Sequence, residues 1–488
     1  MRAVAASVTA WALSGCVVIV GPRALGDEAE GSESSDELGD SDSGESTGLP
    51  DLPDTTDTTD TTDPTDTTDT GDTDGGDTAL PLYPGDRVHS PITAPVVAAL
   101  QQIRAEAPQA PSDLFMKVGA SSTVSHSTLY CFADDIVDLD VHEATLGPSL
   151  DFFLLGEAAG TTPFDRDTLA AAVGKTAAWV ISGSPSPLEQ ELVALGPAGP
   201  SLALIHYGAN DMQQGLSYAS ALPGYYAAMS DLLDQLIELG VVPVVFGLSR
   251  RLDQPSADLW VQSYNAVARG LAQARAIPFV DLRLALEALP NYGVSGDGLH
   301  LESYDGGPCI FDPEGLQHGY NVRNLIALEV LDRAHAAIDA DQNPDAGVPV
   351  LSGDGSLEAP FAVDALPFAD SRDSAAGPGM ELDVYDGCGT TADESGPEHL
   401  YRLELAQTTA IRALVLDREG VDVDIHLLAD GATTADCLAR DDSLLELTLD
   451  AGIYYFSLDT YVNGQGIEQS GEYTFVVLEC EMGDIDCM

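Results

Sequence analysis

Residues 201–211 read Ser-Leu-Ala-Leu-Ile-His-Tyr-Gly-Ala-Asn-Asp, and they provide the clearest indication of the fold. The run Leu202–His206 is short and mostly apolar, and Gly208 follows it closely. Similar runs lie at 114–118, 179–181, 241–246 and 277–282. Segments with helical spacing separate them, at 188–195, 225–239 and 257–274. Short strands that are buried on both faces and joined through helices predict an α/β fold with a doubly wound parallel sheet.

Polar residues that could take part in catalysis follow these predicted strands. Gly119-Ala120-Ser121 comes after the first run, and Asp297-Gly298-Leu299-His300 comes in a loop after the last. Ligands of such sheets bind at the carboxyl ends of the strands, so we expect these residues to meet there. Acyl transfer needs a nucleophile, a base that activates it and a group that orients the base. We therefore predict Ser121 as nucleophile, His300 as general base and acid, and Asp297 as the residue that orients His300.

Ser121, Gly183, Asn210 and His300, in this order and each after a predicted strand, resemble the four sequence blocks of the SGNH (GDSL-type) hydrolase superfamily. The resemblance extends over residues 117–333. It implies a flavodoxin-like fold and ester hydrolysis through an acyl-enzyme, with no metal or organic cofactor. It also implies an oxyanion hole made of the backbone N–H groups of Ser121 and Gly183 and the side-chain amide of Asn210.

Two departures from the family pattern leave another interpretation open. Ala120 stands where the family usually has Asp, and the second block around Gly183 lacks its usual asparagine. Gly174 is the less favoured glycine for that block, since it precedes the predicted strand at 179–181. The alternatives are a non-catalytic surface binding lipoprotein that keeps the fold, and a structural envelope lipoprotein with no open pocket. We further expect His206 to be a core histidine and Arg323 to pair with a carboxylate, with an anionic group of the substrate as the alternative partner of Arg323.

The charge of the chain is strongly negative and unevenly distributed. Of 488 residues, 80 are acidic and 19 are basic, which gives a net charge of −61. Without a basic cluster, binding to nucleic acid or to a membrane through a polybasic patch is excluded. Residues 26–80 contain 19 acidic and no basic residues, and Asp-Thr-Thr triplets fill 55–70. Residues 17–84 are therefore predicted to form a disordered acidic tether. The remaining charge of −42 should repel polyanionic substrates.

The N-terminus has the features of an export signal. Met1 and Arg2 precede an apolar run that ends at Leu13-Ser14-Gly15-Cys16, which resembles the lipobox of bacterial lipoproteins. We predict residues 1–16 as a lipoprotein signal peptide, with Cys16 lipidated and the lipid as the only membrane contact. The protein would then be held at the bacterial cell envelope, at the outer membrane or the cell surface. An ordinary signal peptide with an incidental Cys16 is the alternative.

Six cysteines remain, and an even number in an exported chain indicates disulfides. Cys131 and Cys309 pair with each other if no bridge crosses between domains. The other four allow three pairings, which stay open: Cys388, Cys437, Cys480 and Cys487. No cysteine or histidine spacing predicts zinc. Oxygen ligands alternate along 339–345 as in a calcium loop, but Pro344 and the missing glutamate favour an acidic linker over 339–355.

After this linker the hydrophobic pattern changes to alternation with period two. Predicted strands are separated by turns and lie at 401–405, 411–416, 423–428, 444–449, 453–458 and 473–478. This pattern predicts an all-β sandwich over 356–488, after a hydrolase domain over 85–338. The stretches 423–427 and 452–456 resemble bacterial pre-peptidase C-terminal domains, which implies an accessory binding or spacing module. The expected partner is a small-molecule or glycan ester, a lipid ester is the alternative substrate, and the oligomeric state is open.

Overall fold

A computed structural model describes residues 81–488 apart from 135, 340–343, 486 and 488. The predicted signal peptide, Cys16 and the predicted tether up to residue 80 lie outside the described residues. The described residues belong to one compact unit, Asp74–Met488. None of the helices in this part of the chain combines the length and the apolar character needed to cross a membrane.

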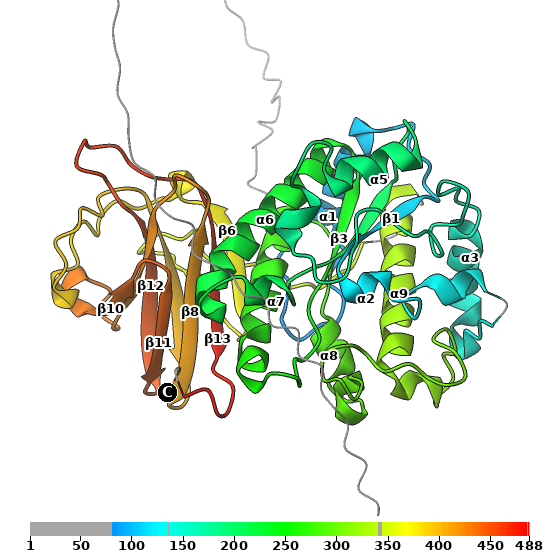
Figure 1. Cartoon of the computed structure of the whole chain (residues 1–488). Helices are drawn as coiled ribbons and strands as arrows, with labels where there is room; N and C mark the ends of the chain where they lie inside the picture. The colour runs from blue at the N-terminus through cyan, green and yellow to red at the C-terminus, as the bar shows by residue number, and fades with distance from the viewer. Residues whose placement is uncertain (1–80, 135, 340–343, 486, 488) are drawn as a thin grey trace, which may run out of the picture. The chain divides into compact units, whose positions relative to one another are not determined.

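A parallel four-stranded sheet forms the centre of the N-terminal part (Figure 1). Its order is β1-β2-β3-β4, and every neighbouring pair is parallel. The strands are β1 (Phe115–Gly119), β2 (Leu202–His206), β3 (Val242–Phe246) and β4 (Phe279–Val280). They are almost wholly buried, which explains why they read as unbroken apolar runs. The predicted doubly wound α/β fold is confirmed.

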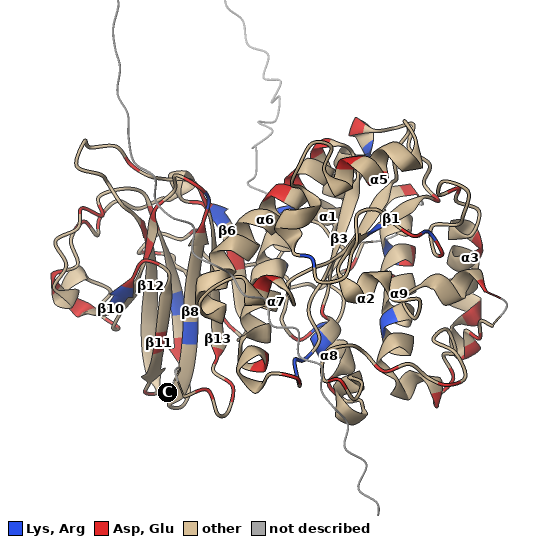
Figure 2. Cartoon of the chain, viewed as in Figure 1, with Lys and Arg blue, Asp and Glu red and all other residues tan. Residues whose placement is uncertain are grey.

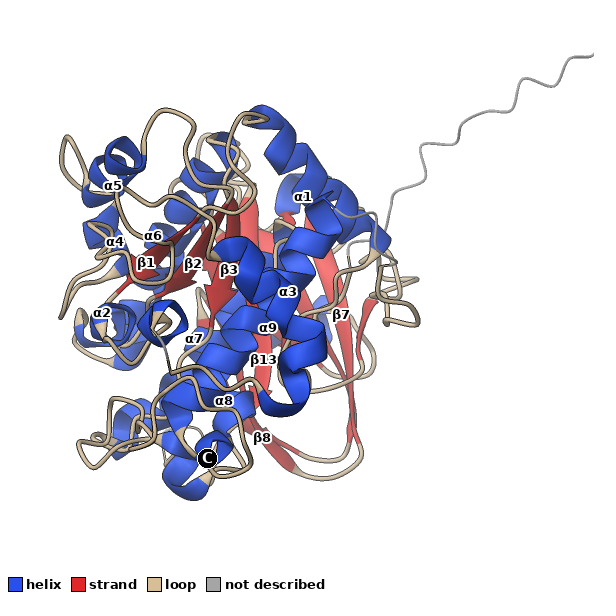
Figure 3. Ribbon diagram, turned by 90° about the vertical axis from the view of Figure 1, so that its right-hand side faces the viewer, coloured by secondary structure: helices blue, strands red, loops and turns tan. Residues whose placement is uncertain are grey.

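Helices cover both faces of this sheet. Helices α6 and α7 lie on one side and α9 on the other (Figures 1 and 3). The longer helices are α1 (Ala94–Glu106), α3 (Glu143–Phe153), α5 (Pro187–Leu195), α6 (Tyr218–Glu238), α7 (Pro255–Ala274) and α9 (Gly319–Asp339). The shorter ones are α2 (Ser121–Val124), α4 (Ala177–Val180) and α8 (Leu282–Leu286). Polar side chains cap the first turn of some helices. At the start of α5 the Ser186 hydroxyl accepts a hydrogen bond from the amide of Glu189.

The predicted strand at 179–181 is wrong. Residues 177–180 form the short helix α4, whose first amide, that of Ala177, donates to Asp211 Oδ1 at 2.9 Å. The place beside β1 is taken instead by 170–172, where Gly119 and Ala171 form a parallel bridge. A short apolar run such as Trp179-Val180-Ile181 does not distinguish helix from strand by itself. The alanines that lie beside β1 have little strand propensity, so the sequence pattern did not reveal them.

The C-terminal part consists of two mainly antiparallel sheets. One has the order β10-β9-β12-β7-β5 and the other β11-β8-β13-β6. Six of the strands fall on predicted positions: β7 (Glu398–Leu405), β8 (Thr409–Asp417), β9 (Val423–Leu428), β11 (Leu444–Leu449), β12 (Gly452–Thr460) and β13 (Glu472–Glu479). Three were not predicted: β5 (Phe361–Val363), β6 (Phe368–Asp373) and β10 (Cys437–Asp441). The inner faces enclose a core that includes Tyr401, Ile425, Phe456 and Phe475.

Part of the outer face of the second sheet is buried as well. Strands β6 and β13 contact α7, and Leu414 and Val476 join the same apolar core as the parallel sheet. Polar contacts accompany this packing, since Gln273 Nε2 of α7 donates to Asp370 Oδ1 of β6 at 3.0 Å. Acidic side chains recur over both parts, whereas basic ones are few (Figure 2). The β-rich part thus shares a continuous core with the α/β part.

Three disulfides connect the six remaining cysteines. The bridge between Cys131 and Cys309 is present, which confirms the predicted pair. The four C-terminal cysteines, whose pairing the sequence left open, form Cys388–Cys437 and Cys480–Cys487.

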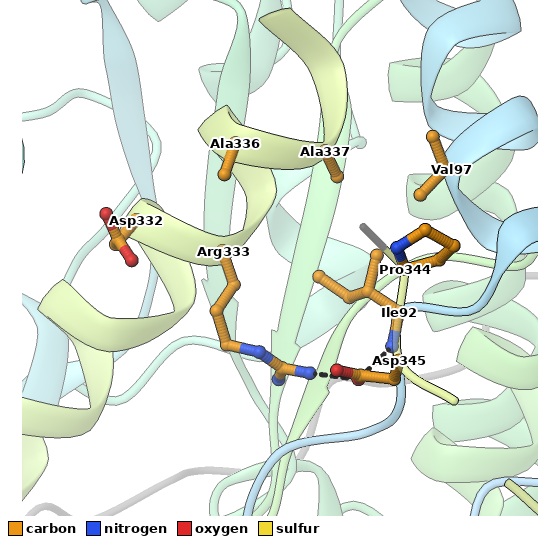
Figure 4. Close-up of a pocket in the computed structure, with 8 residues that line it drawn as sticks. All are labelled: Ile92, Val97, Asp332, Arg333, Ala336, Ala337, Pro344 and Asp345. Carbon is orange, nitrogen blue, oxygen red and sulfur yellow. Dashed lines mark hydrogen bonds and ion pairs between the residues drawn. The ribbon is translucent and has the colours of Figure 1, made fainter. Parts of the chain in front are cut away.

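The segment after α9 is fastened back onto the N-terminal part. Asp345 Oδ2 accepts from the Arg333 guanidinium at 2.6 Å and from the backbone amide of Ile92 at 2.8 Å (Figure 4). Asp339 in turn lies 3.3 Å from the ring of His335. Two of the four oxygen positions of the calcium-like pattern are therefore engaged by protein groups, and residues 341 and 343 lie outside the described residues.

Candidate active site

Ser121 is the first residue of α2, directly after β1. Its backbone N–H is one of those that a helix start leaves without an intrahelical partner. The turn from β1 into α2 is tight, because a Cβ on Gly119 would lie 2.1 Å from Thr123 Oγ1 and 2.9 Å from the His206 carbonyl oxygen. Glycine at 119 therefore permits α2 to start close to the sheet, with the Ser121 side chain half-buried at the carboxyl end of β1.

The three predicted triad residues lie in hydrogen-bonding contact. Ser121 Oγ is 2.9 Å from His300 Nε2, and His300 Nδ1 is 2.7 Å from Asp297 Oδ2. An ionised Asp297 accepts from Nδ1–H, which leaves the lone pair on Nε2 to accept the Ser121 proton. This is the arrangement that activates a serine nucleophile.

Asp297 is held ionised by its own loop. Its Oδ1 accepts from the Ser295 hydroxyl at 2.8 Å and from the amides of Leu299 and His300 at 2.9 Å. Although desolvation alone would raise the pKa of Asp297, the hydrogen bonds from His300, from these amides and from Ser295 lower it well below its usual range. The charged form that orients His300 is thereby present throughout the neutral range.

Asn210 lies in the same cavity as Ser121. This cavity is lined by Ala120, Ser121, Asn210, Ser249, Arg251 and Leu299 among others. One N–H of the Asn210 amide donates to the Lys175 carbonyl at 2.9 Å, and the second N–H remains for a ligand. The structure therefore brings together Ser121, Asn210, Asp297 and His300, as predicted.

Neither Gly183 nor Gly174 is among the residues that line this cavity, so the strand pattern has to decide between them. The prediction of Gly183 as an oxyanion donor rests on a strand before it. The structure has α4 before Gly183 instead, and Gly183 is exposed. The glycine that follows the extended segment beside β1 is Gly174, and its neighbour Lys175 accepts the hydrogen bond from Asn210. The reason for preferring Gly183 over Gly174 is thus removed.

Asp211 has a structural role that the sequence analysis missed. It is 4% exposed, and its two carboxylate oxygens accept from the amides of Ala177 and Gly208 at 2.9 and 3.0 Å. Burial raises the pKa of Asp211 to about 6, against the opposing effect of these amides. The carboxylate joins the loop that carries Asn210 to the start of α4. The adjacent Asn-Asp pair was the available signal.

Arg251 is a second residue that the sequence analysis missed. Its Nη1 donates to the Ala209 carbonyl at 2.8 Å, and its Nε and Nη2 donate to the two carboxylate oxygens of Asp253 at 2.9 and 3.0 Å. The amide of Asp253 donates to the Gly298 carbonyl at 2.9 Å. Arg251 therefore connects the loop of Asn210 to the loop of Asp297 and His300. No sequence motif marks it.

Arg251→Lys is expected to lower kcat about 10- to 100-fold, since a lysine keeps the charge but cannot hold both loops with a planar fork. The measurement is steady-state hydrolysis of a short acyl ester. Arg275→Lys is the matched control, because Arg275 makes a similar two-point contact with Asp234 and does not line the cavity. Equal kcat values for the two variants would contradict the positioning role of Arg251.

Residues 155–303 match the model of the GDSL-like Lipase/Acylhydrolase family. The chain contains a GDSL-like lipase/acylhydrolase domain. The matched range of this domain includes Asn210, Asp297 and His300 but begins after Ser121. The serine is therefore placed in the site by its contact with His300. A search of curated proteins finds no match to the chain.

Solved structures similar to parts of the chain have low identity to it. A GDSL-like lipase from Bacteroides thetaiotaomicron is 14% identical, with 49% of this chain and 99% of that chain covered and a TM-score of 0.30. A catalytic mutant of an acetylxylan esterase from Geobacillus stearothermophilus is 13% identical, with 44% and 93% covered and a TM-score of 0.28. The pre-peptidase C-terminal domain of a Bacillus anthracis collagenase is 16% identical, with 23% and 89% covered and a TM-score of 0.16.

Proposed function

We propose that this chain is a serine ester hydrolase that acts through an acyl-enzyme. The observation that carries the proposal is the chain of contacts from Ser121 Oγ to His300 Nε2 and from His300 Nδ1 to Asp297. As Ser121 attacks the ester carbonyl, His300 accepts its proton and then donates it to the leaving alcohol. Water, activated by His300, hydrolyses the acyl-enzyme in the second half of the reaction.

The oxyanion of each tetrahedral intermediate needs donors aimed at it. We assign the backbone N–H of Ser121, the side-chain N–H of Asn210 and the backbone N–H of Gly174 to this role. Gly174 replaces Gly183 in the assignment because the segment before Gly174, not a segment before Gly183, lies beside β1.

Gly174→Ala is expected to lower kcat about tenfold, whereas Gly183→Ala is expected to change kcat less than twofold. Both glycines have positive φ, +73° and +94°, so alanine is strained at either position. Only at 174 would the resulting backbone shift move an oxyanion donor. The measurements are kcat and the free energy of unfolding of both variants. A loss of kcat confined to the Gly183 variant would restore the original assignment.

The size of the cavity favours a short acyl group. The space inside it that the centre of a water molecule can occupy measures about 30 Å³. A site for one water needs about 10–15 Å³ by this measure. An acetyl group fits such a space better than a long acyl chain. We therefore propose acetyl or similarly short esters of sugars or small molecules as substrates, and the negative charge of the chain disfavours polyanionic ones.

Labelling with a fluorescent alkyl phosphonate tests the serine mechanism. One covalent adduct, located on Ser121 by peptide mass spectrometry, is the expected result with folded protein. Absence of an adduct would contradict the proposed serine hydrolase. It would favour the alternative of a non-catalytic binding lipoprotein, which is motivated by Ala120 in place of the family's aspartate. The substrate range is tested separately by comparing kcat/KM for p-nitrophenyl acetate and decanoate, and a preference for decanoate would contradict the short acyl group alone.

We also propose that Cys16 carries the lipid that holds the protein at the bacterial envelope, on the strength of Leu13-Ser14-Gly15-Cys16 alone. Cys16→Ser in the full chain, expressed in a bacterial host, is expected to move the protein from the detergent phase to the aqueous phase in a partition experiment, since acyl chains supply the membrane affinity. A wild-type chain found in the aqueous phase would contradict the anchor.

A further inference from the structure

A second cavity lies beneath the turn that carries Ser121. Its polar lining comes from Lys117 of β1, Thr123 of α2, Thr128, His206 of β2 and Arg323 of α9. His206 lines this inner cavity and the active-site cavity as well. The space inside this inner cavity that the centre of a water molecule can occupy measures about 20 Å³.

Two buried basic side chains, Lys117 and Arg323, face this cavity, and neither is paired with a carboxylate within the described residues. Burial lowers the pKa of Lys117 to about 7, whereas Arg323 keeps its charge throughout the neutral range. Lys117 is 2% exposed, and its Nζ donates to the Phe164 carbonyl at 2.7 Å and lies 3.7 Å above the Tyr130 ring. Arg323 is 4% exposed, and the expectation that it pairs with a carboxylate is wrong for the described residues. In a chain with 80 acidic residues this is unexpected, because burial of a charge is costly unless it is compensated.

The hydrogen bonds of Arg323 show which atoms around the cavity are donors. Its Nη1 donates to the Ser122 carbonyl at 3.0 Å and its Nη2 donates to His206 Nδ1 at 3.2 Å. Because a guanidinium cannot accept, Nδ1 must be the acceptor, and neutral His206 carries its proton on Nε2. Burial and the nearby Arg323 lower the pKa of His206, opposed by the Gly247 carbonyl, so the ring is neutral.

Thr123 supplies an independent observation. It is 3% exposed, and its Oγ1 has no hydrogen-bond partner among the residues that the structure describes. The neighbouring Thr128 differs, because its hydroxyl donates to the Ser122 carbonyl. The Thr123 hydroxyl is therefore available to a group bound in the cavity that it lines. Since no acidic side chain lines the cavity, that group meets positive charge and hydrogen-bond donors.

We propose that this inner cavity binds a small monovalent anion of halide size, held by the charge of Arg323 and by hydrogen bonds from the amino group of Lys117 and the hydroxyl of Thr123. A single water needs about 10–15 Å³ by the measure used for the cavity, so the space suits a ligand of the size of one water or one halide. The anion compensates the guanidinium that holds the Ser122 carbonyl, one residue from Ser121. The proposal does not depend on the hydrolysis of esters.

Thermal unfolding of the purified protein with bromide or chloride, exchanged for gluconate at constant ionic strength, tests the proposal. The expected result is a saturable rise of Tm with either halide, as for any ligand that binds the folded state. Crystals grown with bromide are expected to show one anomalous peak between Arg323 and Thr123. Density for a water without an anomalous signal would overturn the proposal.

The Thr123→Val variant tests whether the halide binds in the inner cavity. The variant keeps the shape of the side chain and removes the hydroxyl, so halide affinity is expected to fall at least tenfold. Thr448→Val, at an exposed position of β11, is the matched control and should keep the wild-type affinity. A halide effect on Tm that is equal in the wild type and in Thr123→Val, or one that is absent from the wild type, would refute the site.

Discussion

Ser121→Ala is expected to lower kcat about 10⁴- to 10⁶-fold, the range observed when a serine nucleophile is removed from a triad. The physical reason is that alanine cannot form the acyl-enzyme, although His300 and Asp297 remain in contact with each other. The measurement is hydrolysis of p-nitrophenyl acetate under saturating conditions. The free energy of unfolding should change by less than about 1 kcal/mol, because the Ser121 side chain is only half-buried.

Ser122→Ala is the matched control, since Ser122 lies on the same helix and also lines the cavity. Its backbone carbonyl, which accepts from Arg323 and Thr128, is kept in the variant. The expected kcat is within tenfold of the wild-type value. If Ser121→Ala retained activity within the same tenfold, the proposed nucleophile would be wrong.

Arg412→Met is expected to lower the free energy of unfolding by about 3–5 kcal/mol, because it leaves a buried carboxylate without its partner. The Arg412 side chain is fully buried, and its Nη2 donates to Asp484 at 2.6 Å and its Nε to Glu446 at 2.7 Å. Its Nη1 donates to the Leu259 carbonyl at 3.1 Å, and the guanidinium lies 3.6 Å above the Trp260 ring. Arg412 thus connects β8 to α7.

Chemical denaturation measures this loss, with Arg402→Met as the control. Arg402 pairs with Glu404 at the surface, and a pair of this kind contributes at most about 1 kcal/mol. Adding Asp484→Asn to Arg412→Met should recover part of the stability, since it removes the uncompensated charge. Equal losses in the Arg412 and Arg402 variants would contradict a structural role of the buried contact.

The contacts of the candidate active site were predictable from the sequence because they depend on local features. Ser121 lies two residues after β1 and Asn210 four residues after β2, and the apolar runs of both strands are visible along the chain. Asp297 and His300 are three residues apart, so one loop brings them together. In a parallel sheet the carboxyl ends of the strands meet at one edge, and the contact between Ser121 and His300 follows from that rule.

The strand expected before Gly183 was predicted wrongly, for a reason that is also local. The apolar run at 179–181 satisfied the pattern of a buried strand, whereas the residues beside β1 are alanines. Whether such a run is helix or strand is decided by contacts with distant residues. Here the contact is that of Asp211 with the Ala177 amide at the start of α4.

The sequence by itself determined the fold class, the four strands of the parallel sheet and the positions of Ser121, Asn210, Asp297 and His300, because periodicity and loop spacing act over a few residues. Only the tertiary structure decided how Arg251 joins two loops, how Arg323 and Lys117 come to face one cavity, and how Arg412 connects β8 to α7. Each of these depends on segments that are far apart in the chain and meet only when the core forms. A buried cation in particular carries no local pattern, since its partners are supplied by the fold.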